Sequence, residues 1–251
     1  MEVESFADIL MQDIENQADK SFLIICNTIK SSQEIYQRLT AKFGEVLYLS
    51  SSILPFKRIE VINQIKKTEG RQLVVSTQVV EAGVDIDLNI VYRDFAPMDS
   101  INQSAGRCNR NGEKGGGFVK LFDLDKAKYI YDPILTNLTR EILRGYEAQI
   151  PEAKLYDLNV AYAKAVRERK AEDNDKSADL IKAMQELRTE DIAHDFKLIK
   201  EDYRNYNIFI PVDEKAEAIW EKYKDCCKVE DDFETGFKRN QEELKEYALS
   251  L

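Results

Sequence analysis

Five short apolar runs alternate with segments of helical pattern over residues 22–123, and this alternation constrains the fold more than any other feature. The runs are FLIIC (22–26), VLYLS (46–50), QLVVST (72–77), NIVYRDF (89–95) and GFVKLFD (117–123). Helical patterns cover residues 31–43, 57–67 and 100–110. Continuous apolar runs are typical of strands buried on both faces, and alternation with helices is typical of parallel sheets. We therefore predict an α/β fold, a parallel sheet with helices on both faces.

The sequence changes character after residue 128, so we divide the chain into regions 1–128 and 129–251. The second region is predicted to be mostly helical with some strand, an α+β region. Its predicted elements are helices over 130–205 with a polar, mobile stretch at 167–179, strands at 196–202 and 206–212, and a helix at 214–224. The last residues, ELKEYALSL, alternate with a period of two, which predicts a strand that breaks off at the end of the printed chain.

Charge and composition narrow the possible partners and compartments. The net charge is −10, but residues 20–128 carry 16 basic and 12 acidic side chains, a balance compatible with phosphate contacts. The remainder, with 20 basic and 34 acidic side chains, is not an obvious nucleic-acid surface. No apolar run approaches the roughly 20 residues of a membrane span. The four cysteines lack the spacing of a zinc site, so we predict a reducing, cytoplasmic setting without a membrane partner.

Several kinds of catalytic site are missing from the sequence. No glycine-rich segment ends in the Lys-Ser or Lys-Thr pair of a phosphate-binding loop. The single histidine, His194, excludes a His-rich metal site, and we predict no metal ligands in this chain. A phosphate-using enzyme that is complete in itself is therefore disfavoured.

Polar residues gather instead in three loops that follow predicted strands: 26–33, 76–87 and 94–100. The carboxyl ends of parallel strands meet at one edge of a sheet, where ligands bind, so we expect these loops to lie together. The third loop leads into the helix predicted at 100–110, which carries Arg107 and Arg110. Two arginines three residues apart suit a solvated helix face, or they can neutralise a phosphate.

The other polar residues of these loops suit the same chemistry. Thr77 and Gln78 can donate hydrogen bonds to phosphates, Gly83 lets a backbone approach closely, and Asp85 can accept from a ribose hydroxyl. The residue types therefore favour a site for a phosphorylated ligand, although ordinary turns and strand caps use the same residues.

The quoted segments also resemble a known family. STQVVEAGVDID (76–87) followed by QSAGRCNRNG (103–112) resembles motifs V and VI of superfamily two helicases, and FLIICNTIKSSQEIYQRL resembles the segment around motif IV. In VVEAGVDID, in FAPMDSINQSAGRCNRNG and in the later FKLI and IFIPV segments, the chain is similar to the CRISPR-associated helicase–nuclease of type I interference systems. The resemblance covers residues 20–125, and more weakly 190–212.

This resemblance implies that residues 1–128 are the second RecA-like domain of an ATP-dependent helicase. ATP and Mg²⁺ would be shared with a first RecA-like domain that this chain lacks, so the chain alone is not expected to be active. The implied roles are arginine fingers at Arg107 and Arg110, nucleotide contacts at Gln103, Gly83, Asp85 and Gly106, and nucleic-acid contacts at Asn27, Thr28, Thr77 and Gln78. The implied partners are single-stranded DNA, the first RecA-like domain, a nuclease domain in the same or another chain, and the CRISPR surveillance complex.

The chain departs from the family pattern at two positions. Ser104 follows Gln103 where such helicases usually have Arg, which removes one potential contact. Ser50 stands where a family segment usually carries His, which puts a nucleic-acid role of that loop in doubt. Two alternatives stay open: a non-catalytic interaction module that keeps the RecA-like shape, or another superfamily two helicase.

Overall fold

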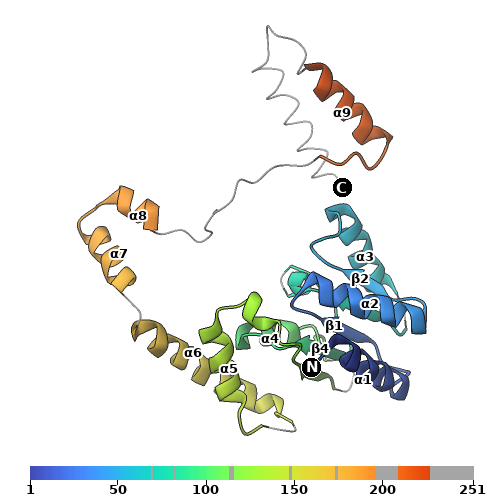
Figure 1. Ribbon diagram of the computed structural model, residues 1–251, viewed down its shortest axis with the longest axis horizontal. Coiled ribbons are helices and arrows are strands. Elements are labelled where there is room, and N and C mark those ends of the chain that lie inside the picture. Colours follow the sequence, from blue (N-terminus) through green and yellow to red (C-terminus); the bar gives the residue numbers. More distant parts are fainter. Residues whose placement is uncertain are drawn as a thin grey trace. The chain divides into compact units, whose positions relative to one another are not determined.

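The computed structural model describes residues 1–68, 70–81, 83–112, 116–146, 149–172, 175–195 and 209–226 (Figure 1). The chain divides into two compact units, residues 1–174 and 175–251. The first unit contains the predicted sheet and also the first helices after residue 128. The functional boundary that the sequence suggests at 128 remains a prediction.

Within the described residues, five parallel strands form one sheet in the order β2-β3-β1-β4-β5. The strands are β1 (Phe22–Ile25), β2 (Leu47–Leu49), β3 (Leu73–Ser76), β4 (Ile90–Asp94) and β5 (Phe118–Phe122). This confirms the predicted α/β class and its RecA-like parallel sheet. In the register of the central strands, Ile25 lies beside Ser76 on one side and Arg93 on the other. The loops that follow these three strands therefore start at one edge.

Helices cover both faces of the sheet, as predicted. They are α1 (Val3–Asn16), α2 (Ile29–Phe43), α3 (Pro55–Lys67) and α4 (Met98–Ala105). Alternate residues of β1 enter opposite cores: Phe22 and Ile24 pack with α1 and α2, whereas Leu23 and Ile25 pack with α3. Both cores consist almost wholly of buried aliphatic and aromatic side chains, so burial of apolar surface is the main force that holds the layers together.

The first helix, α1, was not anticipated from the sequence. Phe6, Leu10 and Ile14, spaced four residues apart, are buried at one face of α1. The ring of Phe6 stacks on that of Phe122 in β5, with ring centroids 3.8 Å apart. This spacing of apolar residues is an ordinary helical signal that would have predicted the helix. In Figure 1, α1 lies next to α2 on the same side of the sheet.

Helices α2 and α3 begin two residues before the predicted starts and end at the predicted residues. The hydroxyl of Thr28 accepts a hydrogen bond from the backbone N–H of Ser31 and so caps α2. Pro55 occupies the first turn of α3, where its missing N–H costs nothing. The prediction for 100–110 is wrong at its end: α4 stops at Ala105, so Arg107 and Arg110 are not on a helix.

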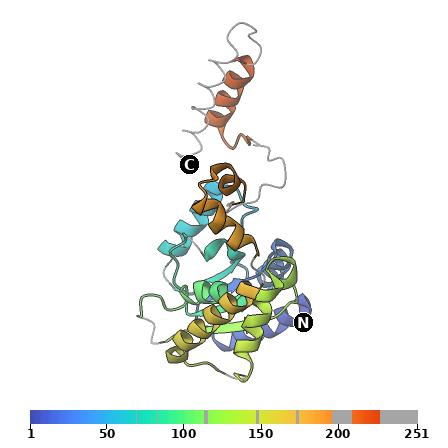
Figure 2. The same ribbon diagram turned by 90° about the vertical axis from the view of Figure 1, so that its left-hand side faces the viewer.

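Two further helices of the first unit extend the fold beyond the sheet. Helices α5 (Pro133–Leu143) and α6 (Leu155–Glu172) run next to each other (Figure 2). Leu138 of α5 and Leu158 and Tyr162 of α6 form a small core with Met98 of α4. Short 3₁₀ turns occur at η1 (Gln78–Val80), η2 (Ala127–Tyr129) and η3 (Glu152–Lys154). Helices α5 and α6 are thereby packed against α4.

The described part of the second unit is helical. It contains α7 (Asp175–Gln185), α8 (Thr189–Asp195) and α9 (Glu214–Cys226), and the ring of Trp220 stacks on that of Phe209. The stretch 167–179, predicted to be mobile, belongs to α6 and α7 wherever it is described. The strand predicted at 196–202 and the terminal segment ELKEYALSL lie outside the described residues. Of the strand predicted at 206–212, only 209–212 is described, and it is neither strand nor helix. Among the helices described, none is long and apolar enough to cross a membrane.

Candidate functional site

The polar edge of the sheet is joined by hydrogen bonds at the ends of its strands. Asp94, the last residue of β4, accepts from the backbone N–H groups of Asn27 and Leu124, each at 3.2 Å. The side-chain amide of Asn27 donates to the backbone oxygen of Phe95 at 2.7 Å. Burial raises the pKa of Asp94, and the two backbone donors oppose that rise. The ends of β1, β4 and β5 are thus fixed to one another.

The four residues expected to contact nucleic acid differ in how much they present to solvent. Asn27 and Thr77 are only 3% and 4% exposed, and both ends of the Asn27 amide are engaged within the protein. Thr28 and Gln78 are partly exposed at the same edge. The hydroxyl of Thr28 caps α2, and the amide of Gln78 donates to the backbone oxygen of Asn27 at 2.9 Å. Of these four residues, Thr28 and Gln78 are the two with substantial side-chain surface open to solvent.

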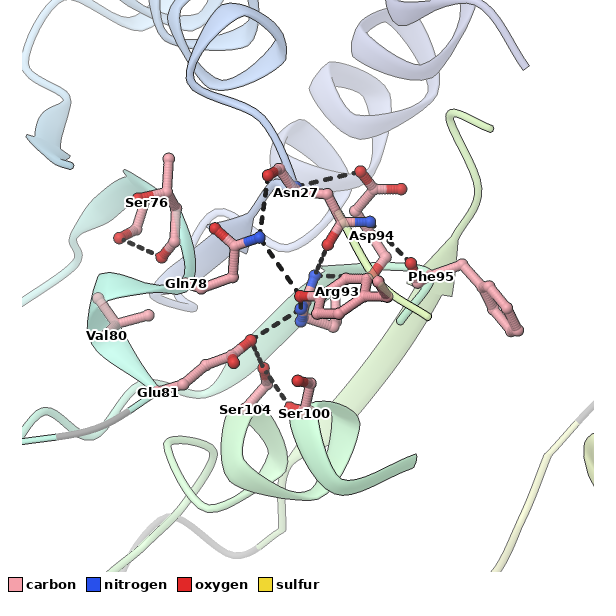
Figure 3. Close-up of polar contacts among 12 residues, drawn as sticks. Asn27, Ser76, Gln78, Val80, Glu81, Arg93, Asp94, Phe95, Ser100 and Ser104 are labelled. Carbon is pink, nitrogen blue, oxygen red and sulfur yellow. Dashed lines mark hydrogen bonds and ion pairs between the residues drawn. The ribbon is translucent and has the colours of Figure 1, made fainter. Parts of the chain in front are cut away.

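A buried arginine, Arg93 in β4, lies behind this edge (Figure 3). Its Nη1 donates to Asn27 Oδ1 and to the backbone oxygen of Asp94, both at 2.7 Å. Its Nη2 donates to Tyr131 Oη and pairs with Glu81 Oε1, both at 2.8 Å. Arg93 was not among the residues predicted for the site, although a cation within an apolar strand of a doubly covered sheet must have buried partners.

Glu81, which follows η1, is the carboxylate in this network. Burial raises the pKa of Glu81, and the neighbouring Arg93 guanidinium counteracts the rise. The hydroxyl of Ser104 donates to Glu81 Oε1 at 3.1 Å and to the backbone oxygen of Ser100 at 2.9 Å (Figure 3). Ser104 is the position where the family pattern has Arg. The guanidinium that pairs with Glu81 comes from Arg93 on β4.

Arg107 is tied to the protein through its guanidinium. Nε donates to the backbone oxygen of Val80 at 2.9 Å, and Nη2 donates to that of Glu81 at 2.8 Å. Desolvation lowers the pKa of Arg107, and Arg110 lowers it further, but an arginine stays protonated because its ordinary pKa is so high. Arg107 therefore holds the main chain at the end of η1.

The side chain of Arg110 is exposed to solvent. Its Nη1 is 3.0 Å from Asp85 Oδ1, and the two side chains are 45% and 71% exposed. Its backbone N–H donates to Asp87 Oδ1 at 2.9 Å. An exposed ion pair of this kind contributes little to stability and can exchange partners readily. Arg110 can thus turn toward an incoming anion.

The segment after α4 returns to the chain that enters β4. Leu88 donates its N–H to the backbone oxygen of Arg107 and accepts from the N–H of Asn109, which places residues 107–109 beside the segment that enters β4. The side chain of Arg107 nevertheless reaches the loop that follows β3, where it binds the backbone oxygens of Val80 and Glu81. A common site for these residues remains a prediction.

The remaining candidates are glycines and Gln103. Gly83 has φ of +72°, a conformation in which other residues are strained, and nothing crowds the position of a Cβ there. Gly106 directly follows α4 with φ of −64°, and Gln103 lies exposed on the same helix. Ser50 is buried and accepts a hydrogen bond from the backbone N–H of Ser52. In the part of the chain that is described, no group of three or more acidic, His or Cys side chains could hold a metal ion.

Comparison with known families agrees with this geometry. Residues 18–113 match the family described as CRISPR-associated nuclease/helicase Cas3, C-terminal. The match runs from just before β1 to just beyond Arg110. This part of the chain is thus similar to the C-terminal helicase region of that family.

Two curated relatives described as CRISPR-associated nuclease/helicase Cas3 are similar to this chain. The protein from Methanothermobacter thermautotrophicus is 30% identical over 158 residues, which are 59% of this chain and 19% of that protein. The protein from Haloferax volcanii is 44% identical over 84 residues, which are 32% of this chain and 9% of that protein. The Cas3-like chain therefore spans a fifth or less of the length of either relative.

Solved structures show the same fold. The crystal structure of T. fusca Cas3 with AMPPNP superposes with a TM-score of 0.52 at 23% identity, covering 66% of this chain and 24% of that one. A chain of a CRISPR RNA-guided surveillance complex in a pre-nicking state gives 0.53 at 23% identity, covering 78% and 27%. At this level of identity the likeness supports the RecA-like helicase fold of the Cas3-like domain and nothing finer.

Proposed function

We propose that the chain is the second RecA-like half of an ATP-dependent helicase that translocates on single-stranded DNA during CRISPR interference. ATP would bind between this domain and a first RecA-like domain, in the same chain or in another. That first domain would also hold Mg²⁺, because the described residues here offer no acidic cluster. A nuclease domain and the CRISPR surveillance complex are the further proposed partners, and the proposed setting is the cytoplasm.

The single observation that carries the proposal is the different state of the two motif VI arginines. The Arg107 guanidinium is engaged with two backbone oxygens, whereas the exposed Arg110 guanidinium pairs with the exposed carboxylate of Asp85. We assign the arginine finger to Arg110, which can leave Asp85 for the γ-phosphate. Arg107 contributes to catalysis through the segment that it holds and faces the same nucleotide.

The other residues take proposed roles around these arginines. On the nucleotide side, Gly83, Asp85, Gln103 and Gly106 line the approach to Arg110, and Asp85 can accept from a ribose hydroxyl once Arg110 has moved. On the nucleic-acid side, Thr28 and Gln78 meet the DNA backbone, with Asn27 and Thr77 supporting them from beneath. Phosphate contacts of this kind position the strand without reading its sequence.

The decisive experiment measures DNA-stimulated ATP hydrolysis by the complete helicase carrying Arg110→Ala. A finger stabilises charge in the transition state, so turnover should fall by roughly 10³–10⁵ while the affinity for ATP changes far less. The matched control is Arg140→Ala, because Arg140 also forms a largely exposed ion pair, with Asp123 at 3.2 Å. Turnover equal to that of the control would refute the finger and favour the non-catalytic interaction module.

The 251-residue chain by itself offers a second check. Because it lacks a phosphate-binding loop, it should not hydrolyse ATP, and adding the first RecA-like domain should restore hydrolysis. Steady hydrolysis by the purified chain that disappears in Arg110→Ala would show that the site is complete in this chain and contradict the shared-site proposal.

A further inference from the structure

The short segment from Gln78 to Glu81 is held from two sides. Arg107 binds the backbone oxygens of Val80 and Glu81 at 2.9 and 2.8 Å. On the other side, the side chains of Gln78 and Glu81 enter the network around Arg93 (Figure 3). This segment therefore begins at Gln78, which is proposed to meet DNA, and ends at the backbone oxygens that Arg107 holds.

Arg93 shares its partners with Gln78. The amide of Gln78 donates to the backbone oxygen of Asn27 at 2.9 Å and to Tyr131 Oη at 3.3 Å. Arg93 donates to the side chain of the same Asn27 at 2.7 Å and to the same Tyr131 oxygen at 2.8 Å. A displacement of Gln78 would therefore disturb two of the four residues that the Arg93 guanidinium contacts. The guanidinium then transmits the displacement to Glu81 through their ion pair.

An arginine is a costly choice for this position if its role is only to fill space. Arg93 is fully buried, and its ion-pair partner Glu81 has a side chain that is 8% exposed. Desolvation of two charges cancels much of their attraction, and well-packed apolar residues often replace such a pair without loss of stability. The rigid fork of a guanidinium, however, can orient several acceptors at once. Here it contacts acceptors in the loop after β1, directly after η1, at the end of β4 and before α5.

We propose that Arg93 is a positioning residue that makes the DNA-facing Gln78 and the nucleotide-facing Arg107 move as one unit. This inference rests on the proposed function. It adds a physical path for the coupling: Gln78, then Asn27 and Tyr131, then Arg93, Glu81 and finally Arg107. Tyr131 directly precedes Asp132, the cap of α5, so the helices beyond the sheet are joined to the same path.

The first test measures amide hydrogen exchange at residues 78–81 in the 251-residue chain and needs no activity. Tyr131→Phe removes one oxygen that both Arg93 and Gln78 use, and Arg93→Lys keeps the charge but removes the fork. The matched control is Tyr92→Phe, which also deletes one hydroxyl but breaks a hydrogen bond to Asp13 at 2.7 Å. Exchange at 78–81 should quicken about tenfold in Tyr131→Phe, the loss expected for one hydrogen bond to a charged group. It should not quicken in Tyr92→Phe.

Equal exchange at 78–81 in Tyr131→Phe and Tyr92→Phe would overturn the inference, whether or not the proposed function is right. If Arg93→Lys does not fold, Tyr131→Phe still decides the question, because it removes no charge and leaves the ring in place.

The second test measures how strongly single-stranded DNA stimulates ATP hydrolysis by the complete helicase. Loss of coupling should reduce the stimulation factor of Tyr131→Phe about fivefold, at the low end of typical coupling between sites, with a smaller change in KM for ATP. Arg110→Ala should instead reduce turnover with and without DNA alike. If Arg110→Ala has no effect, the proposed function fails; if Arg110→Ala acts as expected but Tyr131→Phe matches Tyr92→Phe, only the coupling path fails.

Discussion

Two arginine–carboxylate pairs of the same domain have nearly equal geometry and opposite surroundings. Arg93 and Glu81 approach to 2.8 Å with side chains 0% and 8% exposed. Arg110 and Asp85 approach to 3.0 Å with side chains 45% and 71% exposed. The difference teaches that burial, and not distance, decides what such a pair can do. The buried pair cannot exchange its partners for water, whereas the exposed pair can.

The division suits the two tasks that a RecA-like half-site combines. A group that meets an incoming phosphate has to leave its resting partner, and an exposed pair lets it go at little cost. A group that relays movement has to keep its partners throughout, and the low effective dielectric of the interior strengthens those contacts. In the function proposed above, the exposed pair would separate when ligand binds, and the buried pair would keep its contacts.

The largest loss of stability is expected when the buried Arg93–Glu81 pair is broken. Arg93→Met leaves Glu81 buried without its cation, which should lower the free energy of unfolding by about 3–5 kcal/mol. Arg110→Met should lower it by less than about 1 kcal/mol, because water and salt already screen that pair. Urea denaturation of the 251-residue chain, followed through the sheet-containing unit, measures both.

The double variant Arg93→Met with Glu81→Gln sharpens this comparison. Much of the cost of Arg93→Met comes from the carboxylate left behind, so neutralising Glu81 should recover part of the lost stability. Equal denaturation midpoints for Arg93→Met and Arg110→Met would show that burial does not decide how much each pair contributes to stability.

An intermediate effect is expected at Arg107, which is partly buried and donates to two backbone oxygens. Arg107→Lys keeps the charge but cannot span both oxygens, so the unfolding free energy should fall by about 1.5–3 kcal/mol. Arg110→Lys is the matched control, and it should change stability by no more than about 0.5 kcal/mol. The same denaturation experiment ranks the two, and a smaller loss in Arg107→Lys than in its control would show that Arg107 does not hold η1.

The sheet could be predicted from the sequence because each strand has its own local signal, a short apolar run, and this signal repeats along the chain. All five apolar runs became strands, and β1, β3 and β4 are buried along their whole length, as expected in a sheet that is covered on both faces. The edge strand β5 instead leaves Phe118, Val119 and Leu121 exposed. The types of the residues at 76–87 and 103–112 favoured a site for a phosphorylated ligand, and the resemblance assigned them to motifs V and VI of a helicase; their individual roles stay predictions. The end of α4 was predicted wrongly at residue 110, although Gly106, directly after Ala105, is a common signal for the end of a helix.

The buried network was missed for a different reason. Arg93 lies in a run of apolar residues, and Glu81 lies in a segment whose neighbours resemble a nucleotide motif, so neither residue stood out. Their pairing depends on the parallel register that puts β4 beside β1, and on the turn after β3 that brings Glu81 back over the sheet. Such contacts between distant segments are not encoded in any local pattern. A charge within a buried strand is the one local signal that a partner must exist elsewhere.

The smallest effect is expected from a third pair, Asp13 with Lys120, whose side chains are 22% and 35% exposed. Partial burial acts to raise the pKa of Asp13, but hydrogen bonds from Lys120 and Tyr92, each at 2.7 Å, outweigh it, and the pKa lies below its ordinary value. A carboxylate with a lowered pKa adds stability above its unfolded pKa of about 3.9, and this contribution is lost as the pH falls through the folded value.

Asp13→Asn should therefore cost about 1 kcal/mol or less at pH 7, since the pair is still screened by solvent, and the difference from the parent chain should shrink steadily below about pH 4. Urea midpoints at pH 7 and pH 3 measure this, with Asp125→Asn as a control whose pair with Lys128 is exposed and should matter less at both values. A difference that grew toward low pH would mean that Asp13 is stabilised in its protonated form, and Asp13–Lys120 would then not be the intermediate case between the buried and the exposed arginine pairs.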